Sequence, residues 1–203
     1  MNSNNYEVLR VYRTKSQAKK SYDRISHFYD YFAGGFESNY RNMALEQLNI
    51  KNGETVLEIG FGTGHCLKQI AKLVGKTGMT YGVEISSGMI EVTKKRLEKA
   101  GLIDRVELYC GDAASLPYNE HKFDAVFMSF TLELFDTPEI LLILNEIKRV
   151  LKPQGRLGVV SMSREDGKSI LFKLYEWAHK KIPKYADCRP IYVEQSLKRL
   201  DSE

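Results

Sequence analysis

The sequence contains no continuous apolar run of the roughly 20 residues that a membrane-spanning helix requires. Its N-terminal stretch, MNSNNYEVLRVYRTKSQAKK, also lacks the apolar segment of a secretory signal peptide. Cysteine is scarce: only Cys66, Cys110 and Cys188 occur, and none belongs to a C-x-x-C pair. These absences predict a cytoplasmic protein with neither a disulfide framework nor a metal site.

A strong excess of charge is also missing, since the net charge is +4 over 203 residues. Lys and Arg are denser in the first 24 residues and after residue 163. Such stretches are typically solvated helix faces, and contact with anionic lipid or nucleic acid is the alternative interpretation. Because the basic residues form no dense patch interleaved with aromatic residues, we expect no nucleic-acid partner.

From residue 55 onward, strand patterns alternate with helical patterns. The strand patterns are TVLEIG (55–60), GMTYGVEI (78–85), RVELYCGD (105–112), FDAVFMSF (123–130) and RLGVVSMS (156–163). Helical patterns cover 65–75, 86–101 and 137–151, and the segment KPQG is expected to turn the chain into the last strand. This alternation predicts an α/β fold, a doubly wound and mainly parallel sheet with helices on both faces. Right-handed crossovers favour the strand order 3-2-1-4-5.

Helices are predicted on both sides of this core, within a single domain spanning 1–203. An N-terminal helical cap (1–50) combines an aromatic-rich helix, which ends near Gly35, with a second helix over 43–50. The core covers 51–163. After it, the amphipathic stretch SILFKLYEWAHKKIP (169–183) predicts a lid helix over a pocket, a helix packed on the sheet, or one that rests on a membrane surface. A C-terminal helix is expected over 191–200.

The segment EIGFGTGH (58–65) places glycines at 60, 62 and 64. A dinucleotide fingerprint would require its third glycine at position 65, where this chain has His65. Glu84 ends the second strand about 20 residues later, the position from which an acidic side chain accepts hydrogen bonds from ribose hydroxyls. Asp112 ends the third strand, where it could meet an adenine edge or serve as a turn residue.

Glu58 discriminates between nucleotide-like ligands. A carboxylate two residues before the first glycine opposes a pyrophosphate but suits a ligand that carries an ammonium and a sulfonium. The alternative is a buried glutamate whose oxygens are satisfied by loop amides. The combined pattern favours S-adenosylmethionine as the ligand and disfavours a nicotinamide cofactor.

The motifs VLEIGFGTGH, YGVEISSGMIEVTKKRL, CGDAASLPYNEHKFDAVFMSF and EIKRVLKPQGRLGVV together resemble the class I S-adenosylmethionine-dependent methyltransferases, over roughly residues 20–200. Within this class the chain is most similar to the ubiquinone/menaquinone-biosynthesis C-methyltransferases and to neighbouring small-molecule and phospholipid N-methyltransferases. Their N-terminal YD…YD pattern is present as Tyr22-Asp23 and Tyr29-Asp30.

The resemblance implies a set of cofactor-binding residues. They are Tyr22, Tyr29, Glu58, Gly60, Gly62, Gly64, Glu84, Ile85, Met89, Asp112, Ala113, Ser129 and Phe130. The glycines would wrap the methionine and ribose portions, and Ile85 and Met89 would pack on the adenine. Ser129 and Phe130 would border the methyl group. The two tyrosines would close the pocket, or they pack within the N-terminal helix.

A general base is needed only if the methyl acceptor starts protonated. His27, Tyr29 and Glu133 are candidates, and the sequence favours none of them. Family members usually add two antiparallel strands after the C-terminal helix, whereas this chain stops at Glu203. We therefore expect either a shortened form or an exposed fifth strand that a partner, including a second copy in a homodimer, could cover.

The sequence thus predicts an enzyme that methylates a small apolar or amphiphilic molecule, such as a quinone precursor or a lipid, and releases S-adenosylhomocysteine. Peripheral membrane contact would fit such a substrate. The alternatives are an S-adenosylmethionine-binding protein without catalysis and a phospholipid or amine N-methyltransferase. Methylation of nucleic-acid bases is disfavoured, because the fourth strand ends in SFTLE rather than the (N/D)PP(Y/F) signature of that class.

Overall fold

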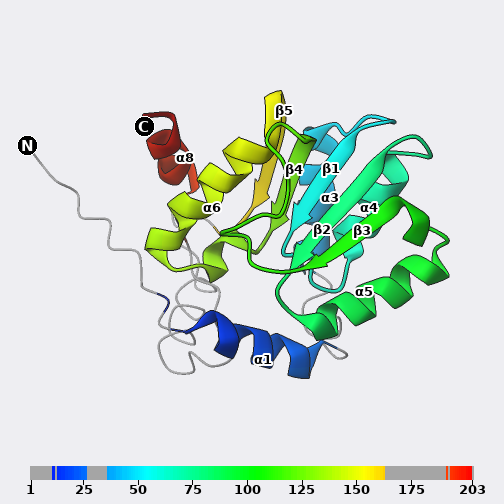
Figure 1. Cartoon of the computed structure of the whole chain (residues 1–203), viewed down its shortest axis with the longest axis horizontal. Coiled ribbons are helices and arrows are strands. Elements are labelled where there is room, and N and C mark those ends of the chain that lie inside the picture. Colours follow the sequence, from blue (N-terminus) through cyan, green and yellow to red (C-terminus); the bar gives the residue numbers. More distant parts are fainter. Residues whose placement is uncertain (1–10, 12, 27–35, 163–190, 192, 203) are drawn as a thin grey trace, which may run out of the picture.

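Five parallel strands form one sheet in the order β3-β2-β1-β4-β5, which confirms the predicted topology (Figure 1). The computed structural model describes residues 11, 13–26, 36–162, 191 and 193–202. The strands are β1 (Thr55–Ile59), β2 (Met79–Glu84), β3 (Val106–Cys110), β4 (Phe123–Ser129) and β5 (Leu151–Val160). The α-helices are α1 (Lys15–Ile25), α3 (Phe36–Leu48), α4 (His65–Leu73), α5 (Ser87–Lys99), α6 (Thr137–Val150) and α8 (Val193–Ser202). Short 3-10 helices are η1 (Ile103–Arg105) and η2 (Leu132–Leu134).

Helices cover both faces of the sheet (Figure 1), because alternate residues of a strand point to opposite sides. On β1, Leu57 and Ile59 belong to an apolar cluster with residues of α6. Val56 belongs to a second cluster, with residues of α3 and α4. Glu58 lies between Leu57 and Ile59 along the strand, so its side chain points to the face covered by α3 and α4.

The fifth strand starts earlier than the sequence predicts. The segment KPQG (152–155), expected to be a turn, lies inside β5, which follows α6 directly. Phe123 of β4 pairs with Leu151 of β5, but Ala125, two residues later, pairs with Arg156, five residues later. The register therefore shifts between these two pairs. Gln154 adopts a left-handed φ of 66° in this stretch. The turn chemistry of KPQG therefore produces a bulge within the strand rather than a break before it.

The N-terminal cap begins with α1. Its N-cap is Thr14, whose hydroxyl accepts a hydrogen bond from the Gln17 N–H in a capping box. The predicted continuation over 27–35, which contains His27 and Tyr29, lies outside the described residues.

The other predicted helices are partly confirmed. α3 starts at Phe36, earlier than the helix predicted over 43–50, and α8 occupies nearly the positions predicted for the C-terminal helix. The predicted lid helix over 169–183 lies outside the described residues. Among the helices that the structure describes, none is long and apolar enough to cross a membrane.

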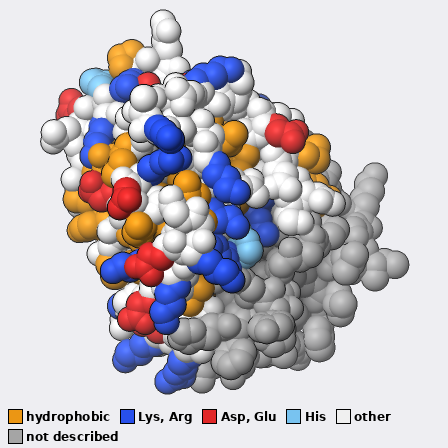
Figure 2. Space-filling model, turned by 90° about the vertical axis from the view of Figure 1, so that its right-hand side faces the viewer, with side chains coloured by type: hydrophobic (Ala, Val, Ile, Leu, Met, Phe, Trp, Pro, Cys, Tyr) orange, Lys and Arg blue, Asp and Glu red, His pale blue; other side chains and the backbone are white. Residues whose placement is uncertain are grey.

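Exposed basic residues lie on the outer faces of α4 and α5, among them Lys72, Lys94 and Lys95. Figure 2 shows the side of the molecule on which these helices lie, with basic, acidic and apolar side chains interspersed on it. This mixture is what solvated helix faces present.

Gly82 in β2 makes room for Phe61, which follows β1. A Cβ at Gly82 would lie 2.6 Å from Cδ1 of Phe61 and 3.1 Å from Cδ2 of Leu67. Gly82→Ala should therefore lower the free energy of unfolding by about 1–3 kcal/mol, because overpacking displaces the ring or the strand. Urea unfolding followed by circular dichroism measures this loss.

The control for this prediction combines Gly82→Ala with Phe61→Leu. The smaller side chain at position 61 should relieve the crowding, so the double variant should lose less stability than the sum of the single variants. Strict additivity would show that Phe61 is not the opposing side chain.

Candidate functional site

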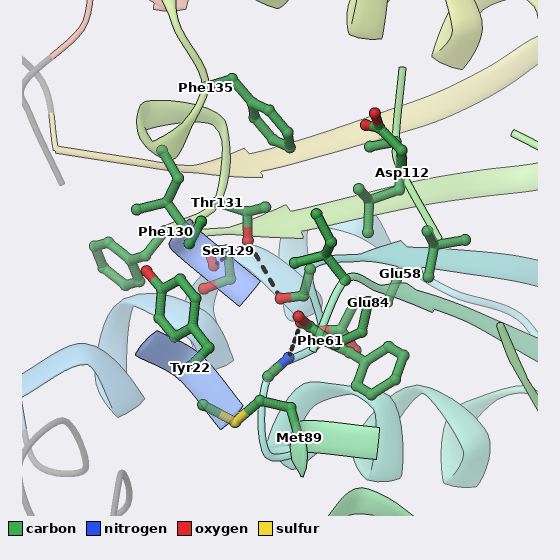
Figure 3. Close-up of a pocket in the computed structure, with 18 of the residues that line it drawn as sticks. Tyr22, Glu58, Phe61, Glu84, Met89, Asp112, Ser129, Phe130, Thr131 and Phe135 are labelled. Carbon is green, nitrogen blue, oxygen red and sulfur yellow. Dashed lines mark hydrogen bonds between the residues drawn. The ribbon is translucent and has the colours of Figure 1, made fainter. Parts of the chain in front are cut away.

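A cavity lies at the carboxyl ends of β1, β2, β3 and β4, and residues of α1 form part of its lining (Figure 3). Ligands bind at this edge of open α/β sheets, where the winding reverses between the two central strands. Most of the predicted cofactor-binding residues line the cavity, namely Tyr22, Glu58, Gly60, Gly62, Glu84, Ile85, Met89, Asp112, Ala113, Ser129 and Phe130. Tyr29 lies outside the described residues, and Gly64 is not part of the lining that the structure describes.

The three loop glycines all adopt a positive φ, of 69° at Gly60, 52° at Gly62 and 77° at Gly64. L side chains rarely adopt this conformation, so the loop requires glycine at each position. A Cβ at Gly60 would collide with Thr131, and one at Gly64 would lie 2.5 Å from Cγ2 of Thr93. At Gly62, by contrast, no atom lies within 4 Å of such a Cβ. Gly62 is therefore the glycine that leaves open space beside the loop, while Gly64 is packed and forms the N-cap of α4.

Glu84 at the end of β2 is held by the backbone. One carboxylate oxygen accepts a hydrogen bond of 3.0 Å from the Gly62 N–H, and the other accepts one of 3.0 Å from the Ser86 N–H. The side chain is 8% exposed, and burial raises its pKa although these hydrogen bonds act in the opposite direction. Each oxygen retains lone-pair capacity, so a ligand that donates two hydroxyl protons could bind the same carboxylate.

Glu58 is the second buried carboxyl group of the cavity and is 2% exposed. Burial raises its pKa well above the ordinary range, and the nearby Glu84 charge adds to this effect, while Arg41 on α3 opposes it. Among the described residues, no donor is within hydrogen-bonding distance of its Oε2. The structure therefore presents a buried acceptor toward which a cationic donor would be attracted.

Asp112 is engaged by two groups of the protein. Its Oδ1 accepts a hydrogen bond of 3.0 Å from the Ala114 N–H, the geometry of an Asx turn. Its Oδ2 pairs with Lys15 Nζ at 2.5 Å, and the same ammonium lies 2.9 Å from Glu139. Lys15 thus ties the start of α1 to the loop after β3 and to the first turn of α6.

The other end of α1 is fixed by Asp23. Its carboxylate accepts hydrogen bonds from the Ser86 hydroxyl at 2.6 Å and from the Gly88 N–H at 3.0 Å, at the N-terminus of α5. Lys19 donates to the same carboxylate at 2.8 Å. Burial acts to raise the pKa of Asp23, but these hydrogen bonds outweigh it and lower the pKa to about 2. The α1 helix is therefore attached over the cavity at both ends.

The end of β4 forms the remaining wall. Phe130 has a left-handed φ of 50°, and its N–H donates to the Val160 carbonyl at 2.7 Å. Thr131 Oγ1 lies 3.2 Å from the Gly60 carbonyl oxygen and 2.9 Å from that of Ser129. Tyr22 and Phe130 both line the cavity and are drawn on the same side of it in Figure 3.

Sequence reasoning missed several lining residues, namely Arg13, Lys15, Arg41, Phe61, Thr131, Leu134 and Phe135. Phe61 and Thr131 are immediate neighbours of predicted residues, so adjacency to the strand ends was a usable signal. Lys15 and Arg41 lie on helices far away in the sequence, and no local pattern indicates their contact with the site.

The candidate base Glu133 is fully buried at 0% exposure. Its Oε1 accepts a hydrogen bond of 3.3 Å from the Met162 N–H, just beyond β5, and the residue is not part of the described cavity lining. This contact gives Glu133 a role in holding the chain beyond β5. The described residues contain no cluster of three or more His, Cys, Asp or Glu side chains that could hold a metal ion.

The residues of the cavity fit S-adenosylmethionine. Glu84 offers two acceptor oxygens to hydroxyl donors, Glu58 offers a buried acceptor to a cation, and Gly62 leaves space for a ligand beside the backbone. Met89, at 1% exposure, supplies a buried apolar side chain at the same cavity.

The raised pKa of Glu58 gives a prediction about stability. The unfolded chain ionises this group at lower pH than the folded chain, so stability falls as pH rises from the ordinary carboxyl pKa toward the raised one. Glu58→Gln should therefore raise the free energy of unfolding at neutral pH by about 1–3 kcal/mol, because glutamine does not ionise in the unfolded chain and so removes the cost of protonating the buried group on folding. The gain should shrink as the pH is lowered toward the ordinary carboxyl pKa. Urea unfolding at several pH values measures it.

Glu146→Gln is the matched control with the opposite sign. Hydrogen bonds from Arg149 lower the pKa of Glu146, so its ionised form stabilises the fold above the ordinary carboxyl pKa. The glutamine should therefore lower stability at neutral pH. A loss of stability for Glu58→Gln at neutral pH would contradict the assignment of Glu58 as a costly buried carboxyl.

A family model described as a methyltransferase domain matches residues 56–155. Among curated proteins, the demethylmenaquinone methyltransferases of Staphylococcus aureus strains JH9 and Newman are 31% identical over 166 residues, which is 81% of this chain. The chain spans 65% of the length of these relatives.

Solved structures agree with this match. An S-adenosylmethionine-dependent methyltransferase from Aquifex aeolicus is 27% identical, with a TM-score of 0.56 and coverage of 77% of both chains. The [4+2]-cyclase SpnF is 25% identical, with a TM-score of 0.74 and coverage of 96% of this chain and 73% of the other. Sequence, sheet order and motifs together establish that the chain belongs to the class I S-adenosylmethionine-dependent methyltransferase family.

Proposed function

We propose that the cavity binds S-adenosylmethionine and that the protein transfers its methyl group to a small apolar or amphiphilic acceptor. The observation that carries this proposal is the pair of buried carboxyl groups, Glu58 and Glu84, at the ends of adjacent strands in one cavity. Burying two such groups together is unfavourable unless a ligand supplies donors and positive charge.

Each part of the ligand has a proposed partner. Glu84 would accept hydrogen bonds from the ribose hydroxyls while it keeps its bonds to the Gly62 and Ser86 amides. Glu58 would neutralise the amino end. The side chains of Ile85 and Met89 would pack against the adenine, and Asp112 and Ala113 would meet the adenine edge.

The bound donor would supply an electrophilic methyl group on a sulfonium, whose sulfur leaves as a neutral thioether. The task of the protein is then orientation and exclusion of water, and orientation can supply on the order of 7–11 kcal/mol of the barrier in favourable cases. Lys15 and Asp23 hold α1 over the cavity and so limit access of water. No described residue is assigned as a general base, so the methylated acceptor would lose its proton to solvent once the product leaves the cavity.

The acceptor class is proposed from the part of the lining not assigned to the nucleoside. It contains the apolar and aromatic side chains of Tyr22, Phe130, Leu134 and Phe135, which favour an apolar, planar acceptor over a small charged one. The demethylmenaquinone methyltransferases among the relatives support a quinone-precursor acceptor. A phospholipid or amine acceptor is the competing possibility within the same reaction type.

A second candidate is an adenosyl-binding protein that catalyses no methyl transfer. The observation that favours it is the similarity to SpnF. The structural match covers 96% of this chain, yet SpnF is named as a cyclase and not as a methyltransferase. Detection of methyl transfer distinguishes the two candidates.

Isothermal titration calorimetry tests the binding proposal. S-adenosylmethionine and S-adenosylhomocysteine should both bind, and Glu84→Gln should weaken binding roughly 10- to 150-fold, as expected for charge-assisted hydrogen bonds of about 1.5–3 kcal/mol. Glu107→Gln, on the exposed edge strand β3, is the matched control and should bind normally. Binding of NAD without binding of either adenosyl compound would contradict the proposal.

The acceptor is tested with S-adenosylmethionine labelled at the methyl carbon. The label should appear in a reduced quinone precursor that lacks a ring methyl group, in preference to phospholipids and small amines. If the label reaches none of these acceptors while S-adenosylmethionine binds normally, the second candidate is favoured.

A further inference from the structure

Thr131 joins the tips of the two central strands. Its hydroxyl lies within hydrogen-bonding distance of the Gly60 carbonyl, just beyond β1, and of the Ser129 carbonyl at the end of β4 (Figure 3). The side chain is 5% exposed and lines the cavity. One hydroxyl group therefore connects the two loops that meet at the centre of the site.

The local backbone is built around this contact. Phe130 has a left-handed φ and its N–H donates to the Val160 carbonyl, and Thr131, the next residue, donates to the Ser129 carbonyl two residues before it. On the opposite side, any Cβ at Gly60 would collide with the Thr131 side chain. The N–H of Gly60 donates to the Val83 carbonyl at 2.7 Å. Gly60 is thus fixed through its N–H to β2 and through its carbonyl to the end of β4.

This corner of the cavity has more acceptors than donors. A threonine hydroxyl has one proton, whereas each of the two carbonyls has two lone pairs, so both can accept further hydrogen bonds. Glu58, which lines the same cavity, adds a buried acceptor, Oε2, with no hydrogen-bond partner among the described residues. A ligand group with several N–H donors on one positively charged atom, an ammonium, matches this set.

We propose that Thr131 is a positioning residue for the amino end of the adenosyl ligand, because it fixes the spacing and direction of the Gly60 and Ser129 carbonyls. This inference rests on the proposed function. It goes beyond the proposed function by assigning ligand discrimination to a side chain that acts through two backbone carbonyls. Thr131 acts through the two carbonyls, and it is not a catalytic residue.

Two ligands separate this role from a general structural one. S-adenosylhomocysteine carries the amino acid, whereas 5′-methylthioadenosine has the adenosyl thioether without it. By calorimetry, Thr131→Val should weaken S-adenosylhomocysteine binding by about tenfold, the order expected when one or two hydrogen bonds are lost. The affinity for 5′-methylthioadenosine should change less than twofold, because the adenosine side of the cavity does not depend on Thr131.

Two further variants serve as controls. Thr131→Ser retains the hydroxyl and should bind both ligands nearly normally. Thr131→Ala removes the hydroxyl without placing a methyl group against the carbonyls, so it should show the same discrimination even if the valine variant folds poorly. Circular dichroism of each variant establishes that the fold is retained.

The outcomes are distinguishable. Equal weakening for both ligands, or normal binding of S-adenosylhomocysteine by the folded alanine variant, would overturn the role of Thr131. Failure of the unaltered protein to bind S-adenosylhomocysteine would instead overturn the proposed function.

Discussion

The site depends on the burial of two carboxyl groups at the ends of neighbouring strands. Glu58 and Glu84 lie at the carboxyl ends of β1 and β2, which pair directly, and the charge of Glu84 makes ionisation of Glu58 harder. The protein offsets this unfavourable arrangement only in part, with two backbone amides on Glu84 and the positive charge of Arg41 near Glu58. Functional sites commonly reduce stability in this way, because buried carboxyl groups without a full set of hydrogen-bond donors are unfavourable.

Rigid anchors place the functional residues. A buried apolar residue directly precedes each of three site residues. Ile59 precedes Gly60, Val83 precedes Glu84 and Met128 precedes Ser129, and none of the three apolar side chains is more than 1% exposed. Each anchor is an apolar side chain fixed within the same core cluster. A residue that directly follows a buried strand position has little freedom to move, so three loops meet with defined geometry although the loops themselves are short.

The sequence predicted the strand order and the glycine loop because both depend on short-range sequence patterns. Apolar periodicity marks the strands, and positive φ values require the glycines. It also raised the alternative that loop amides satisfy a buried glutamate. In the structure, the Gly62 amide binds Glu84 rather than Glu58, a choice that strand pairing makes and residue spacing cannot reveal.

Other features could not be predicted because they depend on tertiary packing. Lys15 and Asp112 are 97 residues apart, and Thr131 reaches a carbonyl 71 residues away. Contacts between residues so far apart in the sequence leave no local sequence pattern. For KPQG the local signal was present but misleading. Its turn propensity was recognisable, whereas its incorporation into β5 depended on pairing with β4.

The attachment of α1 has a consequence for how the cavity opens. None of its residues from Lys15 to Ile25 is buried. It is attached by polar contacts, among them the partly exposed ion pair from Lys15 to Asp112 and the hydrogen bond that Asp23 accepts from the buried Ser86. A helix held by such contacts can detach in a local equilibrium that leaves the apolar core intact. Dissolved ions screen exposed charges but hardly affect apolar burial. The attachment of α1 is therefore expected to weaken as ionic strength rises, while the apolar core beneath the cavity stays intact.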